Sequence, residues 1–220
     1  VAQVREAGIA DSALIANSIC VMSGSTTDGC FAMNFEDYQR EGQAAYARLA
    51  DTVARILEVV LENVPDIRVQ QIQSRAKSVN SLRSKLNDRG AAEGDDVEAL
   101  VKDLAGCRIV CYTNSDVARL VSSQIIGDNF EVDWDRTKFH YPPSEPTAAS
   151  LFISYNYVLK LKEERVALPE YSEHRDMWCE VQVQTTLDHA WSEMAHDTIY
   201  KRFPGGFGGT LMKDVEARMA

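Results

Sequence analysis

Hydrophobic side chains recur at helical spacing between residues 34 and 64, which predicts one long amphipathic helix. Asn34 is a suitable N-cap, and Pro65 ends the helix because its nitrogen carries no hydrogen to donate. The apolar stripe consists of Tyr38, Tyr46, Leu49, Val53, Ile56, Leu57, Val60, Leu61 and Val64. Because nothing in this stretch suggests chemistry, we interpret the helix as packing scaffold.

Beyond this helix the pattern alternates between strand-like and helical segments. We expect, in chain order, a strand over 66–75, a helix over 78–89, a helical turn within 94–102, a buried strand over 103–112 and an amphipathic helix over 115–126. Ser78 and Gly90 are the expected cap and stop of the first helix, and Gly127 is the expected stop of the last. The buried face of the first strand stays open, because Val69 and Ile72 fall on opposite sides of a simple alternation.

The last third of the chain predicts three strands and a final helix. We expect strands over 130–138, 151–161 and 178–184, with a flexible, proline-containing loop over 137–150 and a second loop over 163–176. In the third strand, one set of side chains alternates with a small apolar set: Trp178, Glu180, Gln182 and Gln184 against Cys179, Val181 and Val183. This alternation is typical of a half-buried strand with one polar face. From Leu187 the period becomes helical.

This order of elements predicts an α/β (α+β) fold, with a mixed sheet of about five strands flanked by helices. We expect a lead-in over 1–33, one domain over 34–201 and a C-terminal tail over 202–220. The sequence contains no internal repeat, no glycine-rich dinucleotide motif and no P-loop.

Composition and net charge exclude some classes of protein for this chain. The chain is 45% hydrophobic and 25% charged and has no apolar run of membrane-spanning length, so we expect a soluble globular protein without membrane partners. A net charge of −10 disfavours general attraction to nucleic acid, so any polyanion site has to be a local basic cluster. The apolar run 13–22 lacks a basic flank and is not assigned as a signal peptide. We expect a cytoplasmic protein and leave secretion open.

The cysteine and histidine spacings give no strong metal signal. No C-x-x-C pair occurs, and the cysteines at 107, 111 and 179 fall inside expected strands, where they pack as small hydrophobes. Cys20 and Cys30 are either free thiols, which we favour, or a pair in an oxidising compartment. His189, Glu193 and His196 share a helical face that suits zinc, but no further ligand is near in sequence, so we set zinc aside.

A basic cluster lies around the expected helix 78–89. Arg75 and Lys77 lead into the helix, and Ser81 and Lys85 lie four residues apart on one of its faces. Cations and a hydroxyl that converge at a helix start suit a polyphosphate. The simpler alternative is a solvated basic surface, against which the acidic background argues.

Three charged residues belong to expected strands or their ends. Asp103 at the mouth of a buried strand is either a metal ligand or a helix cap. Arg108 inside that strand needs a partner, because an unpaired buried guanidinium is costly. Glu180 projects from the polar face of its strand. This face either contacts a metal, a ligand or water in a site, or is an ordinary solvent-exposed surface.

Four blocks in order carry a family resemblance: R-A-K-S-V-N-S-L-R-S-K over 75–85, D-L-A-G-C-R-I over 103–109, the strand near 151–159, and E-V-Q-V-Q-T through H-D-T-I-Y-K over 180–201. Each block is weak alone, but their order and spacing are specific. Over residues 67–201 the chain resembles the RelA/SpoT-type nucleotide pyrophosphokinase (alarmone synthetase) domain. The resemblance implies a nucleotidyltransferase-like fold and transfer of pyrophosphate from ATP to the ribose 3′-hydroxyl of an acceptor nucleotide, usually GDP or GTP.

The same resemblance implies residue roles. The donor set, which would hold the phosphates and adenine of ATP, is Arg75, Lys77, Ser81, Lys85 and Arg108. Asp103 resembles the magnesium ligand, and Glu180 resembles the carboxylate that helps bind Mg²⁺ and activates the acceptor hydroxyl. The chemistry agrees, because Mg²⁺ prefers one or two carboxylates plus phosphate oxygens, and phosphoryl-type transfer needs chiefly positioning and charge neutralisation.

The acceptor block departs from the family pattern Gly-Tyr-x-Ser-x-His. The aligned residues are Leu151, Phe152, Ser154 and Asn156, so serine is kept and the other three differ. Phe152 retains an aromatic ring that stacks on a base. We therefore expect either GDP/GTP or an adenine nucleotide as acceptor. The expected acceptor set is Phe152, Ser154, Asn156, Lys138 and His196.

Two alternative functions stay open. A tRNA 3′-end pyrophosphokinase would use a local basic patch formed by Arg136, Lys138, Lys160 and Lys162, although the net charge argues against tRNA as a partner. A regulatory nucleotide-binding module without catalysis agrees with the altered acceptor block, but Asp103 and Glu180 oppose it. Oligomerisation is also left open.

Overall fold

The computed structural model describes residues 33–92, 94–140 and 154–194. Its first element is the predicted long helix, which consists of α1 (Phe35–Asp37), a π-helical turn (Tyr38–Gly42) and α2 (Gln43–Glu62). The Asn34 side chain accepts a hydrogen bond from the backbone N–H of Asp37 at 3.0 Å, which confirms the predicted N-cap. The sequence pattern gives no sign of the π-helical turn.

A mixed five-stranded sheet forms the centre of the described structure and confirms the predicted fold class. Its strands are β1 (Val69–Ala76), β2 (Ala105–Cys111), β3 (Phe130–His140), β4 (Ser154–Leu161) and β5 (Cys179–Thr185). The order across the sheet is β1-β2-β5-β4-β3. The β2–β5 pair is parallel and the other pairs are antiparallel. The parallel pair places Gly106 beside Glu180, although the two residues are distant in sequence.

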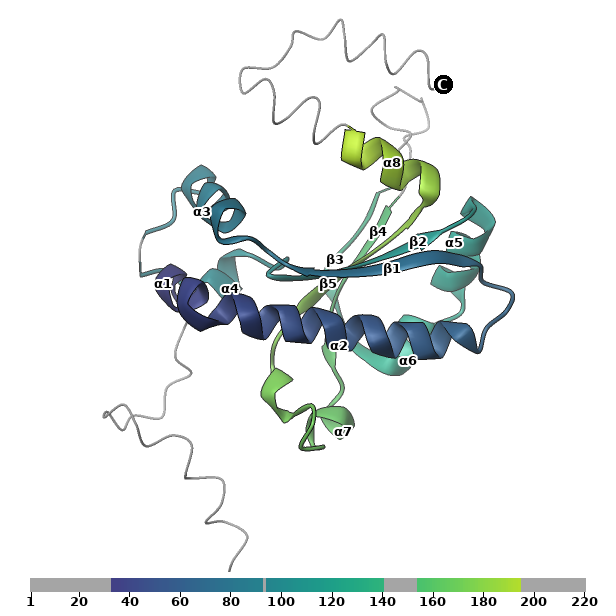
Figure 1. Cartoon of the computed structure of the whole chain (residues 1–220), viewed down its shortest axis with the longest axis horizontal. Coiled ribbons are helices and arrows are strands. Elements are labelled where there is room, and N and C mark those ends of the chain that lie inside the picture. The colour runs from purple at the N-terminus through teal and green to yellow at the C-terminus, as the bar shows by residue number, and fades with distance from the viewer. Residues whose placement is uncertain (1–32, 93, 141–153, 195–220) are drawn as a thin grey trace, which may run out of the picture. The chain divides into compact units, whose positions relative to one another are not determined.

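The hydrophobic core lies between α2 and one face of the sheet. Figure 1 shows α2 along this face and α3 (Val79–Asp88) and α8 (Thr186–Met194) on the opposite side. Leu57 of α2 and the strand residues Ile109 and Val183 are fully buried in this layer, where each such side chain contributes about 2 kcal/mol. The strand cysteines are free and buried in the same core, as predicted: Cys107, Cys111 and Cys179.

The opposite face of the sheet carries polar side chains in two neighbouring rows. The strand register aligns one row across all five strands: Gln73, Arg108, Gln182, Asn156 and Lys138. The next row runs through Arg75, Gly106, Glu180 and Val158. Because residues two apart on a strand share a face, both rows lie on the side of α3 and α8.

A β-bulge in β1 determines which face of this strand is buried. The pairing with β2 shifts between Val69 and Gln71. Because the extra residue reverses the alternation, Val69 and Ile72 both pack against the core. Gln73 and Arg75 then fall on the polar face.

The helices after β1 and before β2 follow the prediction. Ser78 caps α3 by accepting a hydrogen bond from the Ser81 backbone N–H, and Gly90 follows with a φ of 65°, in the left-handed region that favours glycine. The predicted helical turn is α4 (Val97–Leu100). Within the described parts of the chain, no helix combines the length and apolar character that spanning a membrane requires.

The prediction of one continuous helix over 115–126 is wrong. The structure has two helices instead, α5 (Asn114–Ser122) and α6 (Ile125–Asn129), and Gly127 lies inside the second. Ser123 donates its hydroxyl to the Leu120 carbonyl, and Gln124 adopts a left-handed φ of 60°. A serine that bonds the preceding turn competes with helix propagation, and the left-handed residue then ends α5.

Both predicted loops contain regular structure. β3 extends to His140, because Lys138 and Phe139 still pair with Asn156 and Tyr155 of β4 after a register shift. The second loop contains the short helix α7 (Glu163–Val166) and a 3₁₀ turn (Ser172–His174). Residues 141–153, with the rest of the first loop and the expected start of β4, lie outside the described residues.

The strand β5 is more buried than the predicted half-buried strand. It lies between β2 and β4, and its polar residues Glu180 and Gln184 are only 7% and 1% exposed. The alternation itself is confirmed, since Val181 and Val183 belong to the core on the other face. The helix predicted to follow is α8, and its expected continuation to Lys201 lies outside the described residues.

Candidate active site

A cavity of about 790 Å³ lies over the polar face of the sheet, with walls from β1, β2, β5, the start of α3 and α8. Among the sequence-predicted residues it is lined by Arg75, Lys77, Ser81, Asp103, Arg108 and Glu180. The fold thus brings together side chains from four segments that the sequence separates by up to 105 positions (75 to 180). We name this cavity the central cavity.

Asp103 binds two lysines at the edge of the central cavity. Lys77 Nζ donates to Asp103 Oδ2, and Lys85 Nζ donates to Asp103 Oδ1, both at 2.8 Å. Burial alone would raise the pKa of the Asp103 carboxyl, but the hydrogen bonds from Lys77 and Lys85 outweigh it and lower this pKa. Asp103 is therefore an ionised carboxylate at neutral pH, held between two ammonium groups.

The residue before β2 and the long helix fix the position of the Lys77 backbone. Its backbone N–H donates to the Leu104 carbonyl at 2.8 Å, and its own carbonyl accepts from the Tyr38 hydroxyl at 2.6 Å. Lys85 reaches the same carboxylate from the last turn of α3. The two lysines thus approach Asp103 from different elements.

Glu180 lies beside Gly106 on the neighbouring strand and faces the central cavity. Lys102 Nζ is 3.6 Å from Glu180 Oε1. Burial raises the pKa of Glu180, the charge of Lys102 opposes this, and the charge of Asp103 adds to the increase. A carboxylate with a raised pKa is a stronger base at neutral pH than an exposed glutamate.

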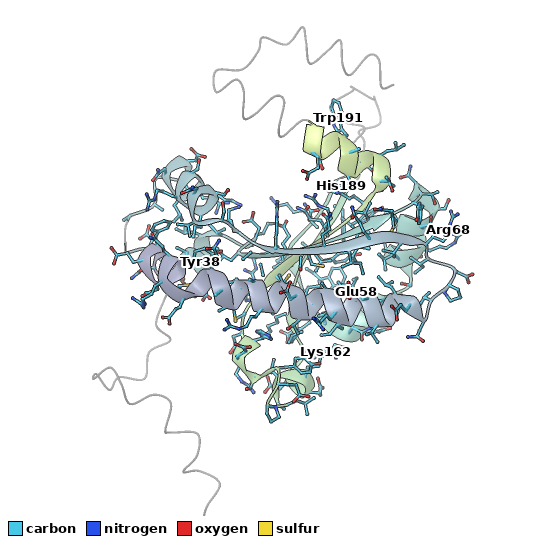
Figure 2. The ribbon with its side chains drawn as sticks, in the orientation of Figure 1. Tyr38, Glu58, Arg68, Lys162, His189 and Trp191 are labelled. Carbon is cyan, nitrogen blue, oxygen red and sulfur yellow. The ribbon has the colours of Figure 1, made fainter. Side chains whose placement is uncertain are left out.

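Arg108 has the partners that a buried guanidinium needs. Its Nε and Nη2 each donate to Gln182 Oε1 at 3.4 Å, and Nη1 donates to Glu193 Oε1 at 2.8 Å. Nη1 also lies 3.0 Å from His189 Nδ1. In Figure 2 His189 lies on the side of α8 nearer the sheet and Trp191 on the other side.

The remaining donor residues border the same space. The Arg75 side chain lies over Gly106, where an added Cβ would be 3.7 Å from Arg75 Cγ. Ser81 is exposed at the start of α3 and accepts a hydrogen bond from the Ser78 hydroxyl at 2.8 Å. Because Gly106 has no side chain, the side chain of Arg75 lies directly over the backbone of β2 at this position.

The expected acceptor residues are described only in part. Lys138 pairs with Asn156 across β3 and β4, in the same polar row as Arg108. Within the described residues, Ser154 Oγ and Asn156 Oδ1 are buried without a hydrogen-bond partner, and neither residue is among those that line the central cavity. Phe152 and His196 lie outside the described residues.

Several residues of the site carry no clear sequence signal. Lys102 approaches Glu180, and Gln182 holds Arg108. Gln182 could have been found as the next residue on the polar face of β5, but Lys102 lies in an irregular segment and only the fold reveals its contact. Among the described residues, no group of three or more His, Cys, Asp and Glu side chains is arranged for a metal, and His189 and Glu193 both contact Arg108.

The polar face of this mixed sheet gathers two carboxylates and several cations, a set of charges whose chemistry suits a polyphosphate together with a metal cation. The family model described as "Region found in RelA / SpoT proteins" matches residues 74–203, and the chain belongs to this family. A sequence comparison with curated proteins finds no match.

Solved structures share this fold at low sequence identity. A GTP pyrophosphokinase family protein from Streptococcus pneumoniae is 17% identical, with a TM-score of 0.65 over 85% of this chain and 88% of that one. Small alarmone synthetase 1 from Bacillus subtilis bound to its product pppGpp is 18% identical, with a TM-score of 0.63 over 84% and 93%. The same protein bound to AMPCPP is 18% identical, with a TM-score of 0.59 over 83% and 92%.

Proposed function

We propose that this protein is a nucleotide 3′-pyrophosphokinase of the alarmone synthetase type. It transfers the β,γ-pyrophosphate of ATP to the 3′-hydroxyl of an acceptor purine nucleotide, with Mg²⁺ as cofactor. Membership of the RelA/SpoT family and the fold shared with small alarmone synthetases support this class of reaction.

The observation that carries the proposal is the Asp103 carboxylate between Lys77 and Lys85, on the same cavity as Glu180. Two lysines and a neighbouring arginine supply the positive charge that a triphosphate needs. In the proposed complex the phosphate oxygens of ATP replace Asp103 as partners of the lysines. The carboxylate of Asp103 then becomes available to a cation.

The two carboxylates of the site fit Mg²⁺. Asp103 and Glu180 are close enough for the charge of one to raise the pKa of the other, and both face the central cavity. Mg²⁺ takes one or two carboxylates together with phosphate oxygens. When bound, the ion would neutralise the charge that develops on the phosphate groups.

Glu180 is the proposed general base. The acceptor 3′-oxygen attacks the β-phosphorus of ATP, the bond from that phosphorus to the α,β-bridging oxygen breaks, and AMP leaves. The proton of the 3′-hydroxyl passes to the Glu180 carboxylate. Its raised pKa suits this step, because proton transfer is most effective when the pKa of the base lies nearer the operating pH.

The acceptor nucleotide occupies the side of the polar face formed by β3 and β4 in this proposal. Ser154 and Asn156 offer buried polar atoms that have no hydrogen-bond partner among the described residues, and a base or ribose would satisfy them on binding. Lys138 provides a cation in the same row for the acceptor phosphates. Phe152 and His196 complete the acceptor set through the family resemblance alone.

An acceptor panel tests the proposal. Purified protein is incubated with ATP and Mg²⁺ and, separately, GDP, GTP, ADP or AMP, and products are separated by ion-exchange chromatography. We expect a new species that carries two additional phosphates with at least one acceptor, and loss of this product in Glu180→Gln. ATP binding without any product would instead support the regulatory module, and a product formed only with tRNA would support the tRNA-modifying alternative.

A further inference from the structure

Helix α8 contacts Arg108 through two side chains that the proposed reaction does not use. Arg108 Nη1 donates to Glu193 Oε1 at 2.8 Å and lies 3.0 Å from His189 Nδ1. His189 and Glu193 are four residues apart, so they project from the same face of α8. Both also line the central cavity.

The partners of Arg108 lie along the edge of its guanidinium group. All guanidinium N–H donors lie in one plane, so hydrogen bonds from Nε, Nη1 and Nη2 use the edge of the group. A guanidinium stacks on an aromatic ring through its flat face. The contacts to Gln182, His189 and Glu193 therefore restrain the group and leave stacking as its remaining mode of contact.

The charge of a second arginine of the donor set also acts on Glu193. The hydrogen bond from Arg108 is the largest cause of the lowered pKa of Glu193, and the charge of Arg75 adds to it. Arg75 and Arg108 extend from adjacent strands on the same face of the sheet. A carboxylate close to both guanidinium groups offsets their mutual repulsion.

We propose that Glu193 and His189 are positioning residues, which hold Arg108 where it receives the adenine ring of ATP. This role rests on the proposed function for the identity of the nucleotide. A free arginine side chain has many rotamers, and ordering it during binding weakens affinity by up to about tenfold. Contacts from α8 that order Arg108 beforehand remove this loss.

The test compares binding of ATP with binding of inorganic tripolyphosphate, which has the phosphates but no adenine. Calorimetry in the presence of Mg²⁺ is carried out on wild type, Glu193→Ala, Glu193→Gln and His189→Ala. Glu62→Gln is the charge-matched control, because Glu62 lies at the exposed end of α2 outside the central cavity. Thermal unfolding establishes that each variant is folded.

Glu193→Ala is expected to weaken ATP binding about tenfold and to change tripolyphosphate binding less than about twofold. Glu193→Gln retains an oxygen that accepts from Arg108 and is expected to recover part of the affinity. His189→Ala is expected to show the same selective loss as Glu193→Ala, and Glu62→Gln none. A general loss of structure would weaken both ligands alike.

Equal losses for ATP and tripolyphosphate, or unchanged ATP affinity in both alanine variants, would overturn the positioning role. Tighter ATP binding by Glu193→Ala would also overturn it, because the carboxylate would then compete with the nucleotide. Failure of the proposed function would give a different result, in which wild type binds ATP but forms no pyrophosphorylated product. The binding comparison would still decide whether the residues of α8 position Arg108. If Glu193→Ala does not fold, Glu193→Gln and His189→Ala supply the same comparison.

Discussion

Asp103 accepts hydrogen bonds through both carboxylate oxygens, one from Lys77 and one from Lys85, and so links these two lysines of the donor set. Asp103→Asn keeps the volume of the side chain and removes its charge. We expect the rate of pyrophosphate transfer to fall by at least about 100-fold, because charge stabilisation of this kind is worth several kcal/mol in phosphoryl transfer. Initial rates at saturating ATP measure the loss.

The matched control for this change is Asp66→Asn, since Asp66 is exposed in the turn after α2. Its rate is expected to stay within about twofold of wild type, as surface substitutions away from a site usually have small effects. A folded Asp103→Asn protein with more than half the wild-type rate would refute the role of Asp103.

Asp116 is a structural carboxylate, fully buried at the start of α5. It accepts hydrogen bonds from Thr113 and from Arg68 Nη2, at 2.5 and 3.1 Å. Asp116→Asn is expected to reduce the free energy of unfolding by about 2 kcal/mol, since hydrogen bonds to a charged group are lost. Urea unfolding measures the difference.

The stability contribution of Asp116 depends on pH in a defined direction. The hydrogen bond from Thr113, followed by those from Arg68, lowers the pKa of Asp116 to about 2. In the unfolded chain the pKa is about 3.9, so the stabilisation is complete above about pH 5 and is lost as the pH falls through about 4 toward about 2. The gap between wild type and Asp116→Asn should narrow over this interval, and a constant gap would contradict the assignment.

At the scale of elements, α2 is the scaffold on which the sheet rests. Leu57→Ala removes a fully buried side chain from this helix and is expected to cost about 3 kcal/mol of unfolding free energy. Val59→Ala, two residues away and 62% exposed, should change it by less than about 0.5 kcal/mol. Denaturant titrations compare the two variants, and equal effects would mean that α2 does not pack on the sheet as described.

Most elements could be predicted from the sequence, because hydrophobic periodicity and caps are local signals. The long helix from Asn34, the helix capped by Ser78 and the alternation in β5 all follow from such signals. The break between α5 and α6 could not be predicted in the same way, since it depends on the left-handed Gln124 and on a serine that bonds the preceding turn. The bulge in β1 likewise depends on pairing with β2.

The composition of the site was less accessible from sequence than the fold. The resemblance pointed to Asp103, Glu180 and the basic cluster, and the structure brings these residues to one cavity. It did not point to Lys102, or to Glu193 as a partner of Arg108, because these contacts join residues 78 and 85 positions apart. Long-range contacts of this kind leave no periodic pattern in a single sequence.

At the scale of the whole molecule, an acidic chain concentrates cations where a triphosphate would bind. Two of the four cations in the patch considered for tRNA contact acidic side chains: Arg136 pairs with Asp133 and stacks over Trp178, and Lys160 lies near Glu131 and Asp176. These cations are engaged with protein groups in the described structure.

We expect the binding of Mg²⁺ and the binding of nucleotide to be coupled, because both would involve Asp103. Because the lysines bind Asp103, a cation on its own would compete with two ammonium groups, whereas a bound triphosphate would pair with the lysines and release the carboxylate. We expect Mg²⁺ to strengthen binding of AMPCPP and to raise the melting temperature much more with AMPCPP than without it. Differential scanning fluorimetry with each ligand alone and with both measures this coupling.

Asp103→Asn is expected to lose most of the coupling while it still binds AMPCPP through the lysines. A large rise in melting temperature with Mg²⁺ alone, or full coupling in this variant, would contradict the arrangement of Asp103 and the lysines.

Phosphorus NMR of the reaction products tests the central claim most directly. Wild-type protein with ATP, Mg²⁺ and the acceptor found in the panel should yield AMP and a nucleotide with a 3′-pyrophosphate in equal amounts, and Glu180→Gln should yield neither above background. Formation of ADP with transfer of a single phosphate, or of inorganic pyrophosphate without a pyrophosphorylated nucleotide, would contradict the account.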